Sequence, residues 1–376
     1  MTGRPRRWLL LATHVPASGS GGGMVRYCVE LARALSARPD VELHLLCARE
    51  ARDFATSVVG TGHVHVLPGL PVVVRSVIER SGPAVLPVLR QEWDVVHGAK
   101  HLLPRRAGRA TRVLTVHDLN PLDRPGDFGP AKRMLLRRPY LASIADADVL
   151  VCVSAATRGR LSAWAPDADP RSTVVHLAAS PTLLAAEGQP VGEVAGRRFV
   201  LVVGDPSPRK NLDFVLRLWP LVAAARPDAT LAVVGPQSWG PTRSAGVGRR
   251  AADGQVALLG HRSDRELAWL YRSAAAVLCP SQLEGFGLPV VEAEALGAPV
   301  VISDDAAMGE VAGPRTVRIS PHDPDAWRSE VLAALDRRPP GVRTGAATQR
   351  HGLTARTWRD VAAETVEAVE AVRRGG

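Results

Sequence analysis

The sequence predicts an α/β protein made of two Rossmann-like domains. Three observations lead to this expectation: the length of the chain, its composition, and the alternation of short apolar runs with helical patterns. The chain has 376 residues, and at roughly 150 residues per domain two domains are expected. Hydrophobic residues make up 46% and charged residues 22% of the chain. That composition indicates a globular protein with buried cores rather than a disordered one.

In the first half, near-continuous apolar runs predict strands buried on both faces of a parallel sheet. These runs cover residues 8–13, 41–47, 64–67, 95–97, 113–116 and 149–153. Helical patterns lie between them, for example at 25–37 and 131–145, which indicates βαβ organisation. The first run follows a basic N-terminus and resembles a signal peptide, but its apolar core breaks at His14. We therefore interpret it as the first strand.

The second half repeats the alternation after a segment rich in Pro, Gly, Glu and Ala. Strands are expected at 199–203, 231–234, 256–259, 276–279, 300–302 and 317–319, and helices at 211–225, 264–273 and 289–296. Residues 235–254 are expected to form a loop, and 358–372 an amphipathic helix. The predicted organisation is a first domain at 1–180, a linker at 181–197, a second domain at 198–352 and a closing helix at 353–376.

Charge and cysteine content exclude several classes of protein. The net charge is +10, yet aromatic residues are only 4% and no nucleic-acid motif is present, so no nucleic-acid partner is expected. No apolar run approaches the ~18 residues of a membrane span. The four cysteines form no CxxC pair, and we expect buried free thiols in a cytoplasmic protein.

Ligands of open α/β sheets bind at the carboxyl ends of the strands, so the loops after strands are the candidate site. Gly19, Gly21, Gly22 and Gly23 follow the first strand and precede a helix. Backbone N–H groups in such a loop suit a phosphate or a sugar hydroxyl. A plain flexible turn explains these glycines equally well, because the spacing matches no dinucleotide or P-loop motif.

Two further loops carry polar side chains. His117 and Asp118 follow the run 113–116, where a histidine can donate a hydrogen bond or move a proton; a polar strand cap is the alternative. Arg209 and Lys210 lie in a strand-to-helix loop and suit a phosphate group. A solvated helix N-terminus is the alternative, although cations are mildly unfavourable there.

The most specific pattern runs from Glu284 to Glu292. A strand leads into a loop, and a helix then begins around Pro289, so its N–H groups can hold a diphosphate. Glu292 lies one turn into that helix, where a carboxylate can accept two ribose hydroxyls. The two carboxylates are spaced as in some glycosidases, but the α/β setting and the basic loops do not favour hydrolysis. No Asp-x-Asp occurs at a strand end in the cleft, so no metal is expected.

The run Glu284-x-Phe286-Gly287-x-x-x-x-Glu292 resembles the EX7E motif of retaining GT-B glycosyltransferases, in particular family 4 (group 1). The glycine loop, residues 94–98, His117-Asp118, the Arg209-Lys210 loop and the closing helix follow in the order of that family, so the resemblance covers nearly the whole chain. It implies a GT-B fold, with two Rossmann-like domains facing across a cleft and the C-terminal helix returning to the N-terminal domain. It also implies transfer of a sugar from a nucleotide-activated donor, with retention of configuration and without metal or other cofactor.

The resemblance further implies a role for each site residue. Arg209 and Lys210 would neutralise the diphosphate, Glu292 would bind ribose, and Glu284 would bind hydroxyls of the donor sugar. His117 would contact the donor sugar near the reacting carbon. Backbone groups would supply the remaining contacts, and the residues concerned are Gly22, Gly23, His261, Phe286, Gly287 and Leu288. The implied catalytic residues are His117, Arg209, Lys210 and Glu284.

One departure bears on the donor. Some family members have Arg after the glycine that ends the first strand of the second domain, whereas this chain has Asp205. The similarity is greatest to members with a Pro-Arg-Lys-Asn loop, often mannosyltransferases of polysaccharide assembly. The expected partners are a GDP- or UDP-type sugar donor and a glycan, lipid-linked or small-molecule acceptor. A non-catalytic GT-B subunit and an epimerase-like enzyme on the same fold are the alternatives.

Weaker features allow a second interpretation each. His63 and His65 lie on one strand face, but the sequence shows no third metal ligand beside them. The basic stretch 132–138 either contacts anionic lipid at the inner face of the membrane or is an ordinary solvated helix face.

Overall fold

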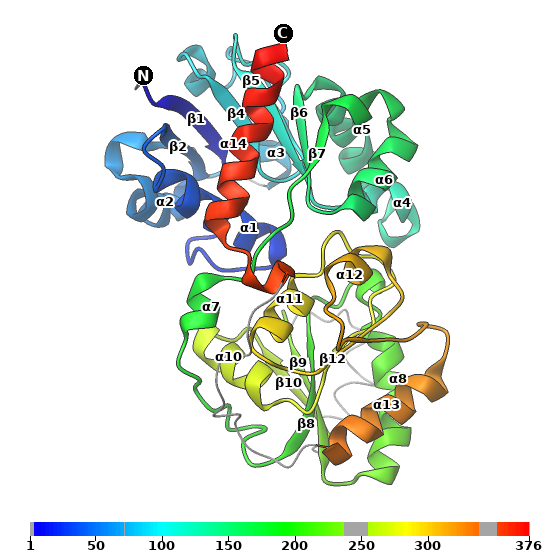
Figure 1. Ribbon diagram of the computed structural model, residues 1–376. Helices are drawn as coiled ribbons and strands as arrows, with labels where there is room; N and C mark the ends of the chain where they lie inside the picture. The colour runs from blue at the N-terminus through cyan, green and yellow to red at the C-terminus, as the bar shows by residue number, and fades with distance from the viewer. Residues whose placement is uncertain (1–3, 71, 237–254, 338–351, 376) are drawn as a thin grey trace. The chain divides into compact units, whose positions relative to one another are not determined.

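The computed structural model (Figure 1) describes residues 4–70, 72–236, 255–337 and 352–375. The chain divides into two compact units. The first unit consists of Met1–Leu177 together with Thr357–Gly376, and the second of Ala178–Arg356. Each unit is built around its own sheet of parallel strands.

The first unit contains a seven-stranded sheet with the order β3-β2-β1-β4-β5-β6-β7. All six pairings between neighbouring strands are parallel. The strands are β1 (Arg6–Leu11), β2 (Val41–Ala48), β3 (Val64–Leu67), β4 (Val95–Gly98), β5 (Thr111–Val116), β6 (Val149–Cys152) and β7 (Ser172–Val174). The helices are α1 (Gly23–Ser36), α2 (Arg52–Val59), α3 (Val72–Glu79), α4 (Asn120–Asp123), α5 (Pro130–Asp146), α6 (Ala155–Trp164) and α14 (Trp358–Gly375). Strands β4 and β6 are buried along their whole length, so they supply buried side chains to both faces of the sheet.

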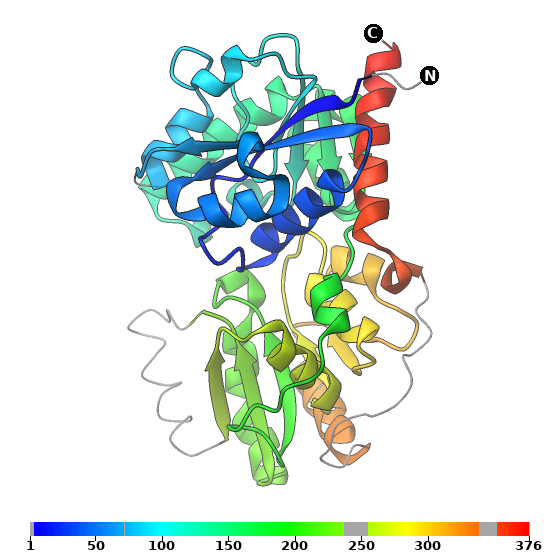
Figure 2. The same ribbon diagram turned by 90° about the vertical axis from the view of Figure 1, so that its left-hand side faces the viewer.

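The C-terminal helix α14 belongs to the first unit. It packs against α1, β5 and β6, as the red helix in Figures 1 and 2 shows. Trp358 lies edge-on to the ring of Tyr27, with 5.9 Å between the centroids. At the other end of the helix, Arg6 is paired with Glu370. Val361, Ala362, Val366 and Val369 of α14 are buried, whereas Val372 near its end is 39% exposed. The buried face explains why the chain returns to this unit.

The second unit contains a six-stranded parallel sheet with the order β10-β9-β8-β11-β12-β13. The strands are β8 (Arg198–Val203), β9 (Ala229–Val234), β10 (Val256–Gly260), β11 (Val277–Cys279), β12 (Val300–Ile302) and β13 (Val317–Arg318). The helices are α7 (Pro181–Ala185), α8 (Leu212–Ala225), α10 (Asp264–Ser273), α11 (Leu288–Ala295), α12 (Ala306–Val311) and α13 (Pro324–Arg337). Phe214 of α8 meets Trp327 of α13 edge-on, at 5.8 Å between ring centroids, within the main core of this unit.

The fold class predicted from the sequence is confirmed: both halves are parallel α/β sheets, and the last helix contacts the first unit. Some details differ from the expectation. The segment expected to be a linker contains α7, and the Arg272 side chain of α10 donates to the Ala186 carbonyl just after it (2.9 Å). Strand β7 was not predicted, because its sequence Ser-Thr-Val contains one apolar residue and so forms no apolar run. The expected loop 235–254 lies almost entirely outside the described residues.

Candidate functional site

A pocket opens in the second unit where strands β8 and β11 end. The space between its walls is about 370 Å³ when the open solvent at its entrance is counted. Its walls come from the end of β8, the loop after it, the loop after β11 and the start of α11, and they include Gly204, Asp205, Lys210, Ser281, Glu284 and Gly287. The pocket therefore lies at the carboxyl ends of central strands, where open α/β sheets bind ligands.

Two cations from one loop meet a carboxylate from the next. Arg209 Nη1 lies 3.0 Å from Glu284 Oε2, and Lys210 Nζ lies 2.5 Å from Glu284 Oε1. The Arg209 side chain also approaches Asp205, with 3.7 Å between Nη2 and Oδ2. The sequence separates Arg209 from Glu284 by 75 residues, and the fold brings them together because β8 and β11 are neighbours in the sheet.

The charges around Glu284 fix its protonation state. Burial raises the pKa of this carboxyl, but the positive charges of Lys210 and Arg209 outweigh that effect and hold the pKa at about 2. Burial also raises the pKa of Asp205, while a hydrogen bond from Ser207 and the charge of Arg209 bring it below its ordinary value. Both groups are ionised near neutral pH, so the pocket has fixed charges of both signs.

The backbone holds the two loops together. The Gln282 N–H donates to the Arg209 carbonyl (2.7 Å), and Asn211 Nδ2 donates to the Pro280 carbonyl (3.2 Å). Asn211 adopts a left-handed conformation with φ of 54°, which asparagine tolerates better than most residues. This turn ends the short 3-10 helix Pro208–Lys210 and begins α8, so it sets the direction of the two cations.

Helix α11 begins at the pocket. Its N-cap is Gly287, with φ of 103°, a conformation that favours glycine. Pro289 occupies a first-turn position, where its missing N–H costs nothing, and Leu288 is the first helical residue. The positive end of the helix dipole therefore points toward the pocket, a favourable arrangement for an anion.

Glu292 lies one turn into α11 and is buried, with 4% of its surface exposed. Tyr271 of α10 donates a hydrogen bond to its Oε2 (3.2 Å). Phe286, between the two glutamates, is also buried. His261 follows β10 and is exposed, and it is not among the residues that line this pocket.

The predicted residues of the first unit gather near the carboxyl ends of its strands. His117 follows β5 and is buried, and its Nε2–H donates to the Ala99 carbonyl (3.0 Å). Burial lowers the pKa of His117, so the ring is neutral at pH 7 and its Nδ1 is left as an acceptor. Gly22 is the N-cap of α1 and Gly23 its first residue, both exposed after β1.

A buried network of side chains packs against His117 in the interior of the first unit. The Tyr27 ring meets the His117 ring edge-on, at 4.6 Å between centroids. Tyr27 also forms a hydrogen bond with Thr115 (2.7 Å), which is bonded in turn to His97 Nε2 (2.8 Å). Sequence reasoning missed Tyr27 and Thr115, because an inward-facing polar residue in an apolar helix or strand leaves no pattern of its own.

Two supporting residues of the second unit were also missed. Asp305 accepts the backbone N–H of Glu284 (3.2 Å) and caps α12 by accepting from Met308 (3.0 Å). Tyr271 anchors Glu292. An Asp before a helical run is a recognisable cap signal, whereas nothing in the sequence connects Tyr271 with Glu292.

Together, two Rossmann-like parallel sheets and a charged pocket at the strand ends of the second one define a GT-B type of protein. The family of glycosyl transferases group 1 matches residues 187–351, and glycosyltransferase family 4 matches residues 21–182. The chain belongs to this family of glycosyltransferases and is an enzyme of the EC 2.4 class, as the EX7E pattern indicated.

Two curated relatives match the sequence of this chain over two thirds or more of their own length. An O-antigen chain mannosyltransferase B from Escherichia coli is 29% identical, with 65% of this chain and 68% of the relative covered. A D-inositol 3-phosphate glycosyltransferase from Mycobacterium bovis is 31% identical, with 93% and 80% covered.

Solved structures agree on the fold. HepE from Anabaena in complex with UDP and glucose superimposes with a TM-score of 0.61 at 17% identity, over 98% of this chain and 99% of that chain. Sucrose-phosphate synthase from Thermosynechococcus elongatus gives 0.64 at 19% identity, over 98% and 94%. Among the described residues, no helix is both long and apolar enough to span a bilayer.

Proposed function

We propose that this glycosyltransferase retains the anomeric configuration and moves a hexose from a nucleoside diphosphate sugar to an acceptor hydroxyl. The observation that carries the proposal is the arrangement of Arg209, Lys210 and Glu284 beside the N-terminus of α11. Two cations and a helix N-terminus favour a diphosphate, while an ionised carboxylate between them accepts hydrogen bonds from hydroxyl groups.

In the proposed reaction Arg209 and Lys210 stabilise the negative charge that develops on the diphosphate as the bond between C1 and the phosphate oxygen breaks. The acceptor hydroxyl forms the new bond to C1 on the face that the diphosphate leaves, and its proton passes to the departing phosphate oxygen. No protein nucleophile, metal or other cofactor takes part. Glu284 orients the sugar by accepting its hydroxyl groups.

The remaining residues bind the donor. Glu292 accepts the ribose hydroxyls, and Tyr271 holds its carboxylate in place. The backbone of Phe286, Gly287 and Leu288 contacts the sugar and phosphate, and the backbone at His261 frames the base.

From the first unit, His117 contacts the donor sugar in the reacting complex. Its Nδ1, the acceptor of a neutral ring whose Nε2–H is already engaged by Ala99, receives a sugar hydroxyl hydrogen. Gly22 and Gly23, exposed at the start of α1, contribute backbone N–H groups to the diphosphate.

Mannose is the first candidate sugar, and GDP or UDP the first candidate nucleotides. Relatives named as a mannosyltransferase and as D-inositol 3-phosphate glycosyltransferases support a hexose and a hydroxylated acceptor. A structural neighbour solved with UDP-glucose supports a uridine nucleotide. The acceptor is a glycan, a lipid-linked sugar or a small molecule.

A thermal-shift screen of the intact chain against UDP-, GDP-, dTDP- and ADP-sugars tests the proposal. A ligand at 100 times its dissociation constant adds about 2.7 kcal/mol to the free energy of unfolding, so the true donor should raise the melting temperature clearly. Transfer from that donor, followed by NMR of the product anomer, then tests retention. A product of inverted configuration, or no response to any nucleotide sugar, would contradict the proposal.

We further propose a cytoplasmic location with peripheral contact to anionic membrane. Arg133, Arg137 and Arg138 of α5 are exposed, and Met134 between them is 65% exposed. Exposed cations around an apolar side chain suit a lipid surface. Co-sedimentation with phosphatidylglycerol vesicles, against phosphatidylcholine vesicles as control, should show salt-sensitive binding that the triple replacement of these arginines by Gln abolishes.

A further inference from the structure

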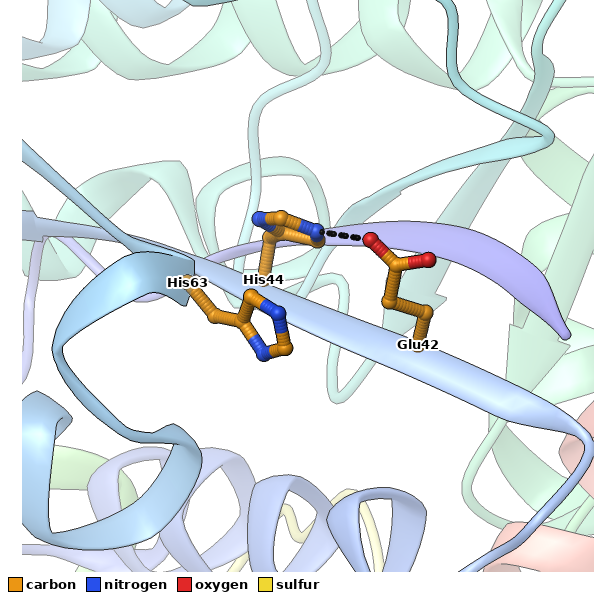
Figure 3. A group of neighbouring side chains, drawn as sticks. All are labelled: Glu42, His44 and His63. Carbon is orange, nitrogen blue, oxygen red and sulfur yellow. Dashed lines mark hydrogen bonds and ion pairs between the residues drawn. The ribbon is translucent and has the colours of Figure 1, made fainter.

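A second cluster of functional side chains lies on the sheet of the first unit, apart from the residues discussed so far. It consists of Glu42, His44 and His63, and Figure 3 shows the three side chains converging over strand β2. One potential ligand atom from each residue lies within 4.8 Å of the other two. His44 Nε2 and Glu42 Oε1 are 2.9 Å apart.

Strand register explains why these residues meet. Leu45 of β2 pairs with Val64 of β3, so His44 lies beside His63, which directly precedes β3. Glu42 comes two residues before His44 and therefore projects from the same face of the sheet. The sequence displays His63 and His65 as a pair, and only the pairing of the strands supplies the further ligands.

The cluster is held in place by its neighbours. His44 is 4% exposed, and its Nδ1 lies 3.2 Å from His65 Nε2, so one of these nitrogens donates to the other. Trp93 packs edge-on against the His44 ring, at 4.8 Å between centroids. A hydrogen bond to the ring nitrogen that does not face the ion is the usual device that orients a metal-binding histidine.

The position of the cluster separates it from the glycosyltransferase site. Glu42 and His44 are near the start of β2, and His63 precedes β3, so the cluster lies at the amino ends of the strands. His117 and the Gly22 loop follow the carboxyl ends of β5 and β1. In a parallel sheet the amino ends and the carboxyl ends of the strands lie at opposite ends of the sheet. The cluster is therefore separated from His117 and the Gly22 loop and has no part in the transfer reaction.

We propose that Glu42, His44 and His63 bind one zinc ion that links β2 to β3, with water as the fourth ligand. Two imidazoles and a carboxylate are a donor set that zinc prefers, whereas magnesium and calcium prefer oxygen ligands alone. Around a tetrahedral zinc, ligand atoms about 2.1 Å from the ion are about 3.4 Å apart. Small movements of Glu42 and His63, both only partly buried, close the present spacing to that value.

The link has a structural purpose in this fold. Strand β3 is the edge of the sheet and has only four residues, so few backbone hydrogen bonds fix it to β2. An ion shared by His44 and His63 would hold the two strands in register. Arg7 Nε lies 3.5 Å from Glu42 Oε1, so the carboxylate is held between Arg7 and His44 on this face of the sheet.

Zinc titration of the tag-free, chelator-treated chain against a chromophoric chelator tests the site. We expect one zinc ion per chain, and a visible absorption spectrum of tetrahedral geometry when cobalt replaces zinc. His63→Ala should weaken zinc affinity at least about 100-fold, since loss of even an outer partner costs about 10–100-fold. The exposed His322 of the second unit provides the matched control, and His322→Ala should bind zinc as the wild-type chain does.

A second readout keeps folding apart from binding. Zinc should raise the melting temperature of the wild-type and His322→Ala chains and leave that of His63→Ala unchanged. Should His63→Ala fail to fold, Glu42→Gln, which preserves shape, takes its place with the same expectations. Less than one zinc ion per chain, an affinity of the ligand variant close to the wild-type value, or an equal loss in His322→Ala would overturn the proposal.

Discussion

At the scale of single residues, the central feature is a carboxylate whose negative charge is already balanced by two cations before any ligand binds. Glu284 bridges Arg209 and Lys210, so the two cations are held in position rather than free to rotate. Electrostatic stabilisation is effective when the charges need no reorganisation at the moment of reaction. The same bridge prevents the cations from repelling each other when the pocket is empty.

Glu292→Gln tests the ribose contact. A ribose contact is the same in the ground state and the transition state, so the substitution should weaken binding of the nucleoside diphosphate by about 1–3 kcal/mol and change turnover little. Calorimetry with the identified nucleotide measures this. Glu187→Gln, at an exposed position of the same unit, should leave affinity unchanged; equal losses in both variants would remove Glu292 from the site.

His117→Ala should show the reverse pattern. If His117 meets the donor sugar only in the reacting complex, its loss should lower turnover at least ~10²-fold, the range of a positioned polar group. Affinity for the nucleoside diphosphate should stay close to that of the wild-type chain. Product formation at saturating donor, together with calorimetry, separates the two effects. Near-normal turnover would mean that His117 only caps strand β5.

At the scale of elements, the start of α11 determines the shape of the pocket. Gly287→Ala places a Cβ at φ of 103°, 3.2 Å from Met308 Cγ. We expect a loss of about 1–3 kcal/mol in the free energy of unfolding, accompanied by weaker nucleotide binding, because the first turn of the helix must shift. Denaturant unfolding and calorimetry measure the two quantities.

The matched control for Gly287→Ala is Gly196→Ala. Gly196 lies in the same unit with φ of 78° and open space around its Cβ position. Gly196→Ala should lower the free energy of unfolding by a similar amount, because the backbone strain is similar, without any loss of nucleotide affinity. If both variants bind nucleotide equally well, the conformation of Gly287 is not what shapes the pocket.

The elements also show what the sequence can and cannot predict. Periodicity located the long strands and the helices around them, since buried parallel strands are continuously apolar. It missed β7, whose sequence Ser-Thr-Val has one apolar residue, and α7, which lies in a Pro-rich segment. It also missed α12 and α13 of the second unit. The candidate site was found where it was predicted, in the loops after strands. The distance between Arg209 and Glu284 depends on which strands become neighbours in the sheet. Spacing along the chain does not show which strands pair, so it could not predict that distance.

At the scale of the whole molecule, the proposals separate catalysis from metal binding. The transfer reaction uses Arg209 and Lys210 where other enzymes use a divalent cation, so a chelator should leave the rate of transfer unchanged. The same treatment should lower the melting temperature by removing zinc from Glu42, His44 and His63. The two measurements are made on one sample. Activity that chelator abolishes and Mg²⁺ or Mn²⁺ restores would contradict the role given to the two cations.

The two units should also respond differently to acid. Burial lowers the pKa of His97 and His14 to about 3 and that of His101 to about 4, and all three belong to the first unit. In the unfolded chain these groups titrate near 6.5, so between about pH 6.5 and 4 the unfolded state binds more protons. The stability they contribute is present above pH 6.5 and is lost as the pH falls.

Glu79 acts in the opposite direction, because burial raises its pKa to about 7. The stability that one carboxyl adds as the pH falls offsets only part of the stability that several histidines remove. In the second unit, Glu284 has its pKa at about 2, and its contribution is fully present above about pH 4.5. Acidification from pH 7 to 5 should therefore weaken the first unit and spare the second.

Hydrogen exchange of the chelator-treated chain at pH 7 and pH 5, corrected for intrinsic rates, measures this difference peptide by peptide. Protection should fall in peptides of Met1–Leu177 and hold in those of Ala178–Arg356. His97 is fully buried, and each pH unit below 6.5 costs about 1.4 kcal/mol for such a group. His97→Gln retains a hydrogen-bonding group for Thr115. It should reduce the loss of stability of the first unit by about 1.4 kcal/mol for each pH unit below 6.5. Equal loss of protection in both units would show that the buried histidines do not govern the acid response.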